Sequence, residues 1–365
     1  METFHRILQG AIDAGASDIH LKAGAPVTYR ISRDLVSVDV PAPTPEWIET
    51  VLTAIVPEAL RERLEREQEV DFAYAPAEFG RFRTNVFQQR GVPVIAMRLV
   101  KTSVSDFGAL HLPEIVRRVS ETPRGIVLIA GATGSGKSTT LAAMIEHINR
   151  TARRHIITLE DPIEYLFTDK HAIIEQREVG LDTASFASGL KNVLRQDPDV
   201  IVIGEMRDPE SIAAAISAAN IGNLVISTVH TADAAKSVQR ILEFFPGADR
   251  DSARRQLATT LHAVICQKLV NATQGGLVPA VEVLLNNAAV EKAIHGGALE
   301  KLQAAMELGA GDGMQTFDQA LYELARTGQI TEAEALVHSP SPESLRMRFQ
   351  GVVLSETRRI LGSRE

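Results

Sequence analysis

The sequence predicts an α/β fold, in which a domain with a mostly parallel sheet is preceded by a small α+β domain and followed by a helical segment. Apolar, strand-like runs alternate with helical stretches from residue 125 to about 286, which is typical of a parallel sheet covered by helices on both faces. Residues 1–100 instead combine two amphipathic helices with short strands, and the pattern from Ala288 onward is helical. The predicted boundaries are 1–100 for the first domain, 101–123 for a linker, 124–286 for the second domain and 287–365 for the helical segment.

Local signals predict the elements of the first domain. Apolar residues recur at helical spacing over 3–14, and Thr44 followed by Pro45 gives the N-cap and first turn of a second helix. Short strand-like segments predict an antiparallel sheet with strands at 18–21, 27–31, 35–38, 72–74, 80–87 and 92–99. The polar stretch that follows contains Pro113 and Pro123 and is predicted as the linker.

A strand, a glycine-rich loop and a helix open the second domain. Residues 126–130 form a continuous apolar run, the pattern of a strand buried on both faces, and 139–147 is a good helix sequence. The residues between them, 131–138, read GATGSGKS and match G-x-x-x-x-G-K-[ST] at every fixed position. In this context the loop predicts binding of a nucleoside triphosphate, against the alternative of a βα turn that binds nothing.

The residue types of this loop suit a polyphosphate. Glycines let successive backbone N–H groups curl around the phosphates, and the helix N-terminus adds a partial positive charge. Lys137 can reach the β- and γ-phosphates, and the Ser138 hydroxyl can ligate Mg²⁺. The predicted nucleotide-binding residues of the loop are Gly131, Thr133, Gly134, Ser135, Gly136, Lys137, Ser138 and Thr139.

A second buried strand, predicted at 155–159, ends in carboxylates. Glu160, Asp161 and Glu164 follow it, at the end of a sheet strand where ligands bind in open α/β folds. We predict that they hold Mg²⁺ through waters and position the attacking water. The alternative is a solvated acidic turn that caps a helix begun by Pro162.

Two more strands end in residues that suit phosphate chemistry. The run 200–203 leads to Glu205, which is predicted to be the general base that polarises the water attacking the γ-phosphate. The run 224–229 leads to His230, which can sense the γ-phosphate or donate to it, although a lone histidine is as often structural.

Three arginines of the first domain form another candidate group. Arg81 and Arg83 are two residues apart in one strand and share a face, and Arg98 lies on the next strand. A hairpin can therefore present three guanidinium groups on one surface. Arginines supplied to a γ-phosphate from another subunit stabilise transition-state charge, which predicts a shared site. The alternative is a solvated basic face.

Composition excludes some classes of protein. The formal net charge of −8 argues against a dedicated nucleic-acid binder. The single cysteine, Cys266, excludes an intramolecular disulfide and a multi-cysteine zinc site, and it lies in an apolar stretch that we expect to be a helix packed in the core. No signal peptide is evident, and no apolar run approaches the roughly 20 residues that span a bilayer. We therefore expect a cytoplasmic protein.

Together these features resemble the type IV pilus retraction ATPases (PilT and PilU proteins) within the secretion-type hexameric ATPases. The resemblance follows the chain in order over nearly its whole length. Its stretches are ASDIHLKAG (16–24), GRFRTNVF (80–87), GATGSGKSTTLAAM (131–144), ITLEDPIEY (157–165), LRQDPDVIVIGEMRD (194–208), HTADAAKSVQRILEFFP (230–246) and GMQTFDQAL (313–321).

This resemblance implies a PAS-like first domain, a RecA-like P-loop ATPase domain and a homohexameric ring. Glu164 of the Asp box, Glu205 of the atypical Walker B motif and His230 of the His box match the family's catalytic positions, and the three arginines match residues that approach the nucleotide. The implied function is Mg²⁺-dependent ATP hydrolysis that powers pilus retraction and twitching motility. The implied location is the cytoplasmic side of the inner membrane, docked on an integral-membrane pilus platform protein and without nucleic acid.

Other members of the class remain alternatives. Residues 289–296, AVEKAIHG, lack two arginines of the family's AIRNLIRE segment, and Asn223 stands where the family usually has His, so an accessory retraction paralogue is one alternative. Pilus assembly and type II secretion ATPases are another, but they usually carry a tetracysteine element that one cysteine cannot build. A RecA-like DNA-dependent ATPase is disfavoured by an aromatic content of 5%.

Overall fold

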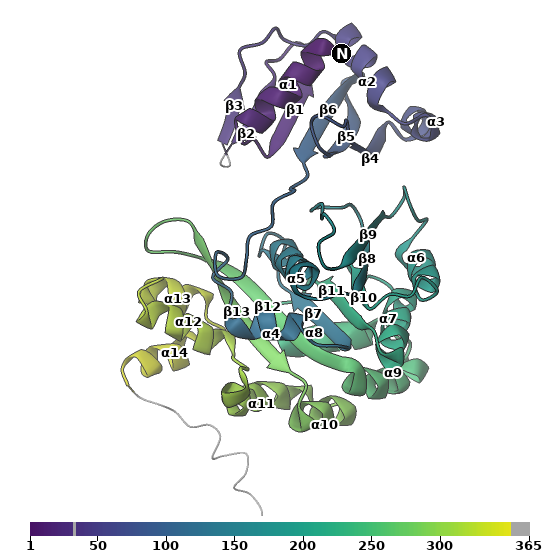
Figure 1. Cartoon of the computed structure of the whole chain (residues 1–365). Coiled ribbons are helices and arrows are strands. Elements are labelled where there is room, and N and C mark those ends of the chain that lie inside the picture. The colour runs from purple at the N-terminus through teal and green to yellow at the C-terminus, as the bar shows by residue number, and fades with distance from the viewer. Residues whose placement is uncertain (32–33, 352–365) are drawn as a thin grey trace, which may run out of the picture. The chain divides into compact units, whose positions relative to one another are not determined.

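The computed structural model describes residues 1–31 and 34–351, which belong to two compact units (Figure 1). The first unit comprises Met1–Thr102 and the short segment Pro162–Leu166, and the second comprises Ser103–Asp161 and the chain from Phe167 onward. Each unit has its own sheet and its own apolar core.

An antiparallel sheet and three helices build the first unit. In spatial order the strands are β3 (Asp34–Ser37), β2 (Thr28–Ile31), β1 (Asp18–Lys22), β6 (Val92–Leu99), β5 (Phe82–Gln89) and β4 (Glu69–Tyr74). The helices are α1 (Glu2–Asp13), α2 (Pro45–Ile55) and α3 (Glu58–Glu67). Phe4 and Leu8 of α1 and Ile48 of α2 are buried in one apolar cluster with the sheet. The amphipathic faces therefore pack as the sequence predicts.

Capping and composition explain the helices of this unit. The Thr44 hydroxyl accepts a hydrogen bond from the Trp47 backbone N–H at 3.2 Å, and Pro45 takes the first position of α2, as predicted. The prediction has no helix at α3. Its sequence, EALRERLERE, buries no residue fully, and only Leu60 and Leu64 pack on the core as half-buried apolar side chains, so its apolar face is too narrow for a clear pattern.

A mostly parallel sheet forms the centre of the second unit. In spatial order its strands are β13 (Leu277–Leu285), β12 (Leu261–Asn271), β7 (Gly125–Ala130), β11 (Leu224–Val229), β10 (Val200–Ile203), β8 (His155–Glu160) and β9 (Ile173–Glu178). Neighbouring strands are parallel except for the antiparallel pair β12–β13. Because the parallel strands point the same way, the residues that follow them meet at one edge of the sheet.

Helices cover both faces of this sheet (Figure 1). One face carries α4 (Glu114–Ser120) and α5 (Lys137–Thr151), and the other carries α6 (Phe186–Val193), α7 (Pro209–Ile221), α8 (Ala234–Glu243) and α9 (Gly247–Thr260). Alternate residues of a strand enter the two cores: Val127 of β7 joins the α5 side, whereas Leu128 joins the α7 side. The predicted α/β architecture is confirmed.

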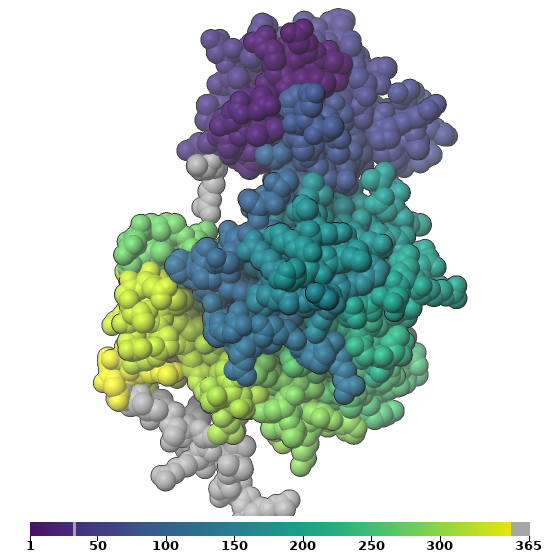
Figure 2. Space-filling model, viewed as in Figure 1, coloured from purple at the N-terminus to yellow at the C-terminus, as the bar shows by residue number. Residues whose placement is uncertain are grey.

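Further helices follow β13. They are α10 (Ala288–Gly296), α11 (Leu302–Leu308), α12 (Phe317–Arg326), α13 (Glu332–His338) and α14 (Pro342–Phe349), with 3₁₀ turns at Leu299–Lys301 and Gly309–Asp312. Helices α12 to α14, yellow in Figure 2, lie beside the green β12–β13 hairpin. Residues 352–365 of the predicted helical segment lie outside the described part of the chain. Among residues 1–31 and 34–351, none of the helices combines the length and the apolar character that a membrane span requires.

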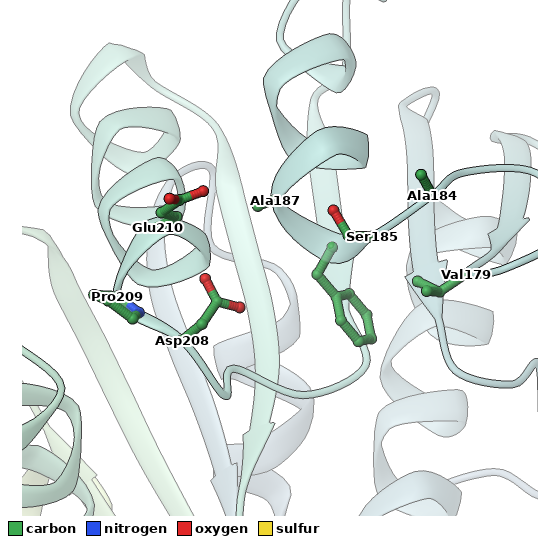
Figure 3. Close-up of a pocket in the computed structure, with 8 residues that line it drawn as sticks. Val179, Ala184, Ser185, Ala187, Asp208, Pro209 and Glu210 are labelled. Atoms are coloured by element: carbon green, nitrogen blue, oxygen red, sulfur yellow. The ribbon is translucent and has the colours of Figure 1, made fainter.

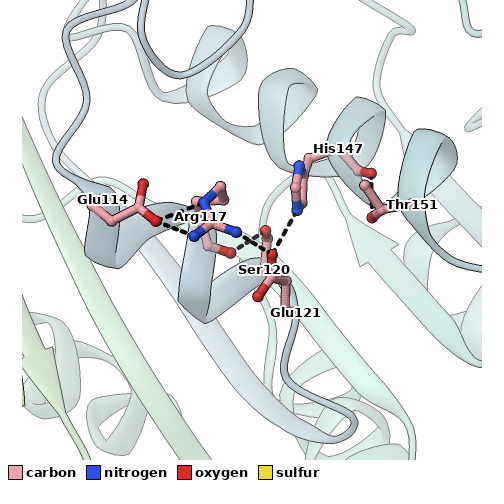
Figure 4. Close-up of polar contacts among 6 residues, drawn as sticks. All are labelled: Glu114, Arg117, Ser120, Glu121, His147 and Thr151. Carbon is pink, nitrogen blue, oxygen red and sulfur yellow. Dashed lines mark hydrogen bonds and ion pairs between the residues drawn. The ribbon is translucent and has the colours of Figure 1, made fainter.

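The stretch predicted as a linker contains α4. Ile115 and Val116 of this helix are buried in the same core as α5. Arg117 pairs with Glu114 and with Glu121, and Glu121 Oε1 lies 3.0 Å from His147 Nε2 on α5 (Figure 4). This part of the stretch therefore packs against the helix of the phosphate loop.

The surroundings of Cys266 correct a prediction. The apolar stretch expected to be helical is the strand β12, which pairs with both β7 and β13. A buried strand and a buried helix can both have a continuous apolar sequence, so the pattern does not separate them. The thiol itself is fully buried, which confirms that Cys266 packs in the core.

Glu282 on β13 connects two helices to the sheet. Its side chain is buried, and its oxygens accept hydrogen bonds from the backbone N–H of Ala234 at 2.9 Å and of Phe317 at 3.3 Å. These residues begin α8 and α12, so one carboxylate caps both helices. Burial raises the pKa of Glu282 to about 7, with Asp233 adding to the rise and the two N–H donors and Lys268 opposing it.

We predict that Glu282→Leu and Glu282→Gln change stability differently. Leu leaves two buried N–H groups without an acceptor, at a cost of about 1–3 kcal/mol each, whereas Gln keeps an oxygen acceptor and carries no charge. Because its folded-state pKa of about 7 lies above the unfolded value, Glu282 contributes stability at low pH that is lost as the pH rises through about 7. In urea unfolding, the Gln variant should therefore gain stability relative to the wild type between about pH 5 and about pH 8.

The comparison with the wild type at each pH cancels the titration of all other groups. If both variants lost the same free energy of unfolding relative to the wild type, and this loss were the same at both pH values, Glu282 would neither cap the helices nor titrate near neutrality.

Candidate functional site

The phosphate loop joins β7 to α5 and can be built only with glycine at two of its positions. Gly131 and Gly136 have φ angles of +151° and +90°, which other residues rarely adopt. A Cβ atom on Gly131 would lie 2.6 Å from the Gln267 carbonyl oxygen, and one on Gly136 would lie 2.7 Å from Gln267 Nε2. The loop therefore approaches β12 too closely for a side chain.

Lys137, the first residue of α5, is buried and turned back onto the loop. Its side chain ammonium donates to the carbonyl oxygens of Gly131 and Ala132, at 2.9 Å in both cases. A buried ammonium group requires such partners, because removing it from water is costly. The phosphate loop thus holds the Lys137 ammonium group at its own first two residues, Gly131 and Ala132.

His230 connects Lys137 to Glu205. Its Nδ1 lies 3.5 Å from Lys137 Nζ, and its Nε2 lies 3.5 Å from Glu205 Oε2. Because an ammonium group can only donate, Nδ1 is the acceptor in the first contact, which leaves the proton on Nε2, facing the carboxylate. The strand order explains the sequence of contacts: β11, which ends before His230, lies between β7 and β10.

Glu205 has a second partner that the sequence analysis does not identify. Arg207 Nη2 lies 2.6 Å from Glu205 Oε2, and this hydrogen bond raises the pKa of the arginine. The carboxylate is mostly buried, with 20% of its side chain exposed, whereas 62% of the Arg207 side chain is exposed. The Thr228 hydroxyl donates to the Gly204 carbonyl oxygen at 2.6 Å, which fixes the start of this turn against β11.

Two of the predicted Mg²⁺ ligands lie at the end of β8: Glu160 is its last residue and Asp161 begins the turn that follows. Glu160 Oε1 accepts hydrogen bonds from Thr158 Oγ1 at 2.7 Å and from Gln176 Nε2 at 3.1 Å, and Asp161 is exposed. Carboxylates and the Ser138 hydroxyl are oxygen donors, the type that Mg²⁺ takes, so the residues fit this ion. The alternative of a helix begun by Pro162 is wrong, because no helix forms there.

The first unit holds the other predicted site residues. Arg83 of β5 and Arg98 of β6 are direct cross-strand partners, and Arg81 lies two residues before Arg83, next to β5. Arg98 Nε donates to Asp18 Oδ1 at 2.7 Å, and Arg83 Nε lies 4.0 Å from Asp71 Oδ1. Arg83 and Arg98 are therefore exposed on one face of this sheet, with an acidic side chain next to each of them.

Glu164 also belongs to the first unit. It is exposed, and its carbonyl oxygen accepts a hydrogen bond from the backbone N–H of Lys101 at 3.4 Å. The next residue, Tyr165, pairs with Lys101 in an isolated parallel bridge. These contacts hold Glu164 and Tyr165 against the segment that follows β6.

The structure also contains a pocket of about 380 Å³ in the second unit (Figure 3). Its walls come from the loop before α6 and from the start of α7. The lining residues are Val179, Ala184, Ser185, Phe186, Ala187, Asp208, Pro209 and Glu210. None of the residues predicted for the nucleotide site lines it.

Comparisons with known proteins agree with this architecture. The model of the family described as type II/IV secretion system protein matches residues 1–294. In Pseudomonas aeruginosa, the type IV pilus ATPase PilU is 38% identical over 95% of this chain and 91% of its own length. The type IV pilus retraction ATPase PilT of the same organism is 38% identical over 90% of this chain and 96% of its own length.

A solved structure supports the same relationship. The pilus retraction motor PilT with bound ADP has 42% sequence identity and a TM-score of 0.87, and the match covers 93% of this chain and 98% of that one. This match confirms the predicted fold class, and the relatives confirm the resemblance to retraction ATPases. The chain belongs to the type II/IV secretion system protein family.

Proposed function

We propose that this chain is an Mg²⁺-dependent ATPase that drives retraction of a type IV pilus and thereby twitching motility. The observation that carries the proposal is the contact of Lys137, His230 and Glu205, three residues that follow neighbouring strands of the second unit. The relatives PilU and PilT are described as ATPases of type IV pili, which supports this activity. The ADP bound to PilT supports an adenine nucleotide as the ligand.

Nucleotide binding gives Lys137 stronger partners. Its present acceptors are the neutral carbonyl oxygens of Gly131 and Ala132, whereas phosphate oxygens are charged. We expect its ammonium group to turn toward the β- and γ-phosphates while the loop N–H groups and the start of α5 hold the rest of the chain of phosphates. This movement also separates Lys137 from His230, whose ring is then free to face the γ-phosphate.

Glu205 then acts on water. A water oxygen attacks the γ-phosphorus, the bond to the ADP oxygen breaks, and the water proton passes to the Glu205 carboxylate. Arg207 and His230 hold that carboxylate in place in the structure, at 2.6 Å and 3.5 Å. Mg²⁺, held by the Ser138 hydroxyl and through waters by Glu160 and Asp161, would neutralise charge on the β- and γ-phosphates.

We also propose a homohexameric ring with sites shared between subunits. The exposed row that contains Arg83 and Arg98 supports this, because guanidinium groups suit a transferring phosphoryl group. Together with Arg81, these arginines would reach the nucleotide of a neighbouring subunit. Glu164, which matches a catalytic position of the family's Asp box, would act at the same nucleotide. The ring would dock on an integral-membrane pilus platform protein at the cytoplasmic face of the inner membrane.

We predict that two substitutions separate binding from hydrolysis. Lys137→Ala removes the phosphate contact and should abolish ATP turnover. Glu205→Gln removes only the base, so it should keep the affinity for a fluorescent ATP analogue while lowering kcat by about 100-fold or more. Lys191→Ala, an exposed lysine of α6, is the matched control and should behave as the wild type.

Turnover by Lys137→Ala at the rate of the control would contradict the site assignment. A well-folded Glu205→Gln protein that loses binding and hydrolysis together would contradict the role of Glu205 as base.

We predict that deleting the gene leaves cells piliated but impaired in twitching. Without the retraction step, extended fibres accumulate because assembly continues. Electron microscopy and stab-agar spreading measure the two effects, and Glu205→Gln should not restore movement when supplied in trans. If the deletion strain had no pili, the chain would drive pilus assembly and not retraction. If the deletion strain twitched normally, the chain would have an accessory role beside a principal retraction ATPase.

A further inference from the structure

Gln267 is a buried polar residue that the proposed mechanism does not yet use. Its side chain is 4% exposed and lies in β12, within the apolar run ICQKLV. The preceding residue, Cys266, pairs with Ala130, the last residue of β7, so Gln267 stands beside the first glycine of the phosphate loop. A buried amide is retained in an apolar strand only when it has hydrogen-bond partners.

The side chain of Gln267 faces the phosphate loop and its helix. Its Oε1 accepts a hydrogen bond from the Thr140 hydroxyl at 2.7 Å. A Cβ atom added to Gly136 would lie 2.7 Å from Gln267 Nε2, and one added to Gly131 would lie 2.6 Å from the Gln267 carbonyl oxygen, so both glycines lie close against this residue. Backbone and side chain of one residue therefore touch both ends of the glycine-rich turn.

Thr140 connects this contact to the residues that meet phosphate. It lies in the first turn of α5, three residues after Lys137, and its backbone N–H donates to Gly136 at 3.0 Å. It is 1% exposed, so its hydroxyl must also be satisfied inside the protein. The Gln267–Thr140 pair thus fixes the start of α5 relative to β12.

We propose that Gln267 is a positioning residue of the nucleotide site, which sets the place of Lys137 and Ser138 through Thr140 and Gly136. The proposal rests on the proposed ATPase function. Gln267 does not touch the reacting atoms. Misplacing a catalytic group by about 1 Å can lower a rate by about 100-fold, so a contact at the base of the loop has a large effect on turnover.

The test removes the hydrogen bond from either side in the full-length chain. Gln267→Met keeps the volume and loses the amide, and Thr140→Val keeps the shape and loses the hydroxyl. Each should lower kcat/KM for ATP by about tenfold or more, and the double variant should lose little beyond either single variant. Thr140→Ser, which keeps the hydroxyl, should retain activity close to the wild type.

A matched control separates positioning from general destabilisation. Asn286 Nδ2 donates to the carbonyl oxygens of Ala258 and Leu261 at 2.8 and 2.7 Å, at the end of β12 opposite the phosphate loop. Asn286→Leu should lower the unfolding temperature without changing kcat or KM, whereas Gln267→Met should change kcat/KM at a temperature where it is fully folded by circular dichroism.

Wild-type kcat and KM in folded Gln267→Met and Thr140→Val, with an active wild type, would overturn the positioning role. Additive losses in the double variant would overturn the pair as its cause. A wild type without ATPase activity would instead overturn the proposed function, so the two failures are distinguishable.

Discussion

The burial of one ammonium group organises the candidate site. Lys137 is 7% exposed, and its charge is satisfied by two carbonyl oxygens of the loop that precedes it and by the ring of His230. Because an unpaired buried charge is costly, the loop backbone must turn its carbonyls inward, and this turn requires the glycine conformations seen at Gly131 and Gly136. The backbone N–H groups of the same loop are the donors that a polyphosphate would meet.

The parallel sheet brings the remaining groups to that lysine. The order β7–β11–β10 places His230 between Lys137 and Glu205, although these residues are far apart in the chain. The first unit carries its arginines on a different sheet, where Asp18 and Asp71 lie beside Arg98 and Arg83. In the proposed motor, the ion pairs of Arg98 with Asp18 and of Arg83 with Asp71 must therefore break when a phosphate binds the guanidinium groups.

Sequence reasoning could predict the features that depend on local pattern. Fully buried strands, the Thr44 cap and the phosphate loop have short-range signatures, and each is present in the structure. It could not predict α3, which buries no residue fully, or the strand character of β12, whose apolar run suits either element. The roles of Gln267 and Glu282 could not be predicted because they depend on tertiary partners. Gln267 contacts Thr140, and Glu282 accepts hydrogen bonds at the N-termini of two helices.

Lys137, His230 and Glu205, which contact one another in the structure, are proposed to surround the γ-phosphate. The most direct measurement is an experimental structure of the full-length Glu205→Gln protein with Mg²⁺ and ATP. In that structure we expect Lys137 Nζ to leave the carbonyls of Gly131 and Ala132 and to lie within hydrogen-bond distance of the β- and γ-phosphates, with His230 facing the γ-phosphate. ATP bound elsewhere, with Lys137 still held by the loop, would contradict this proposal.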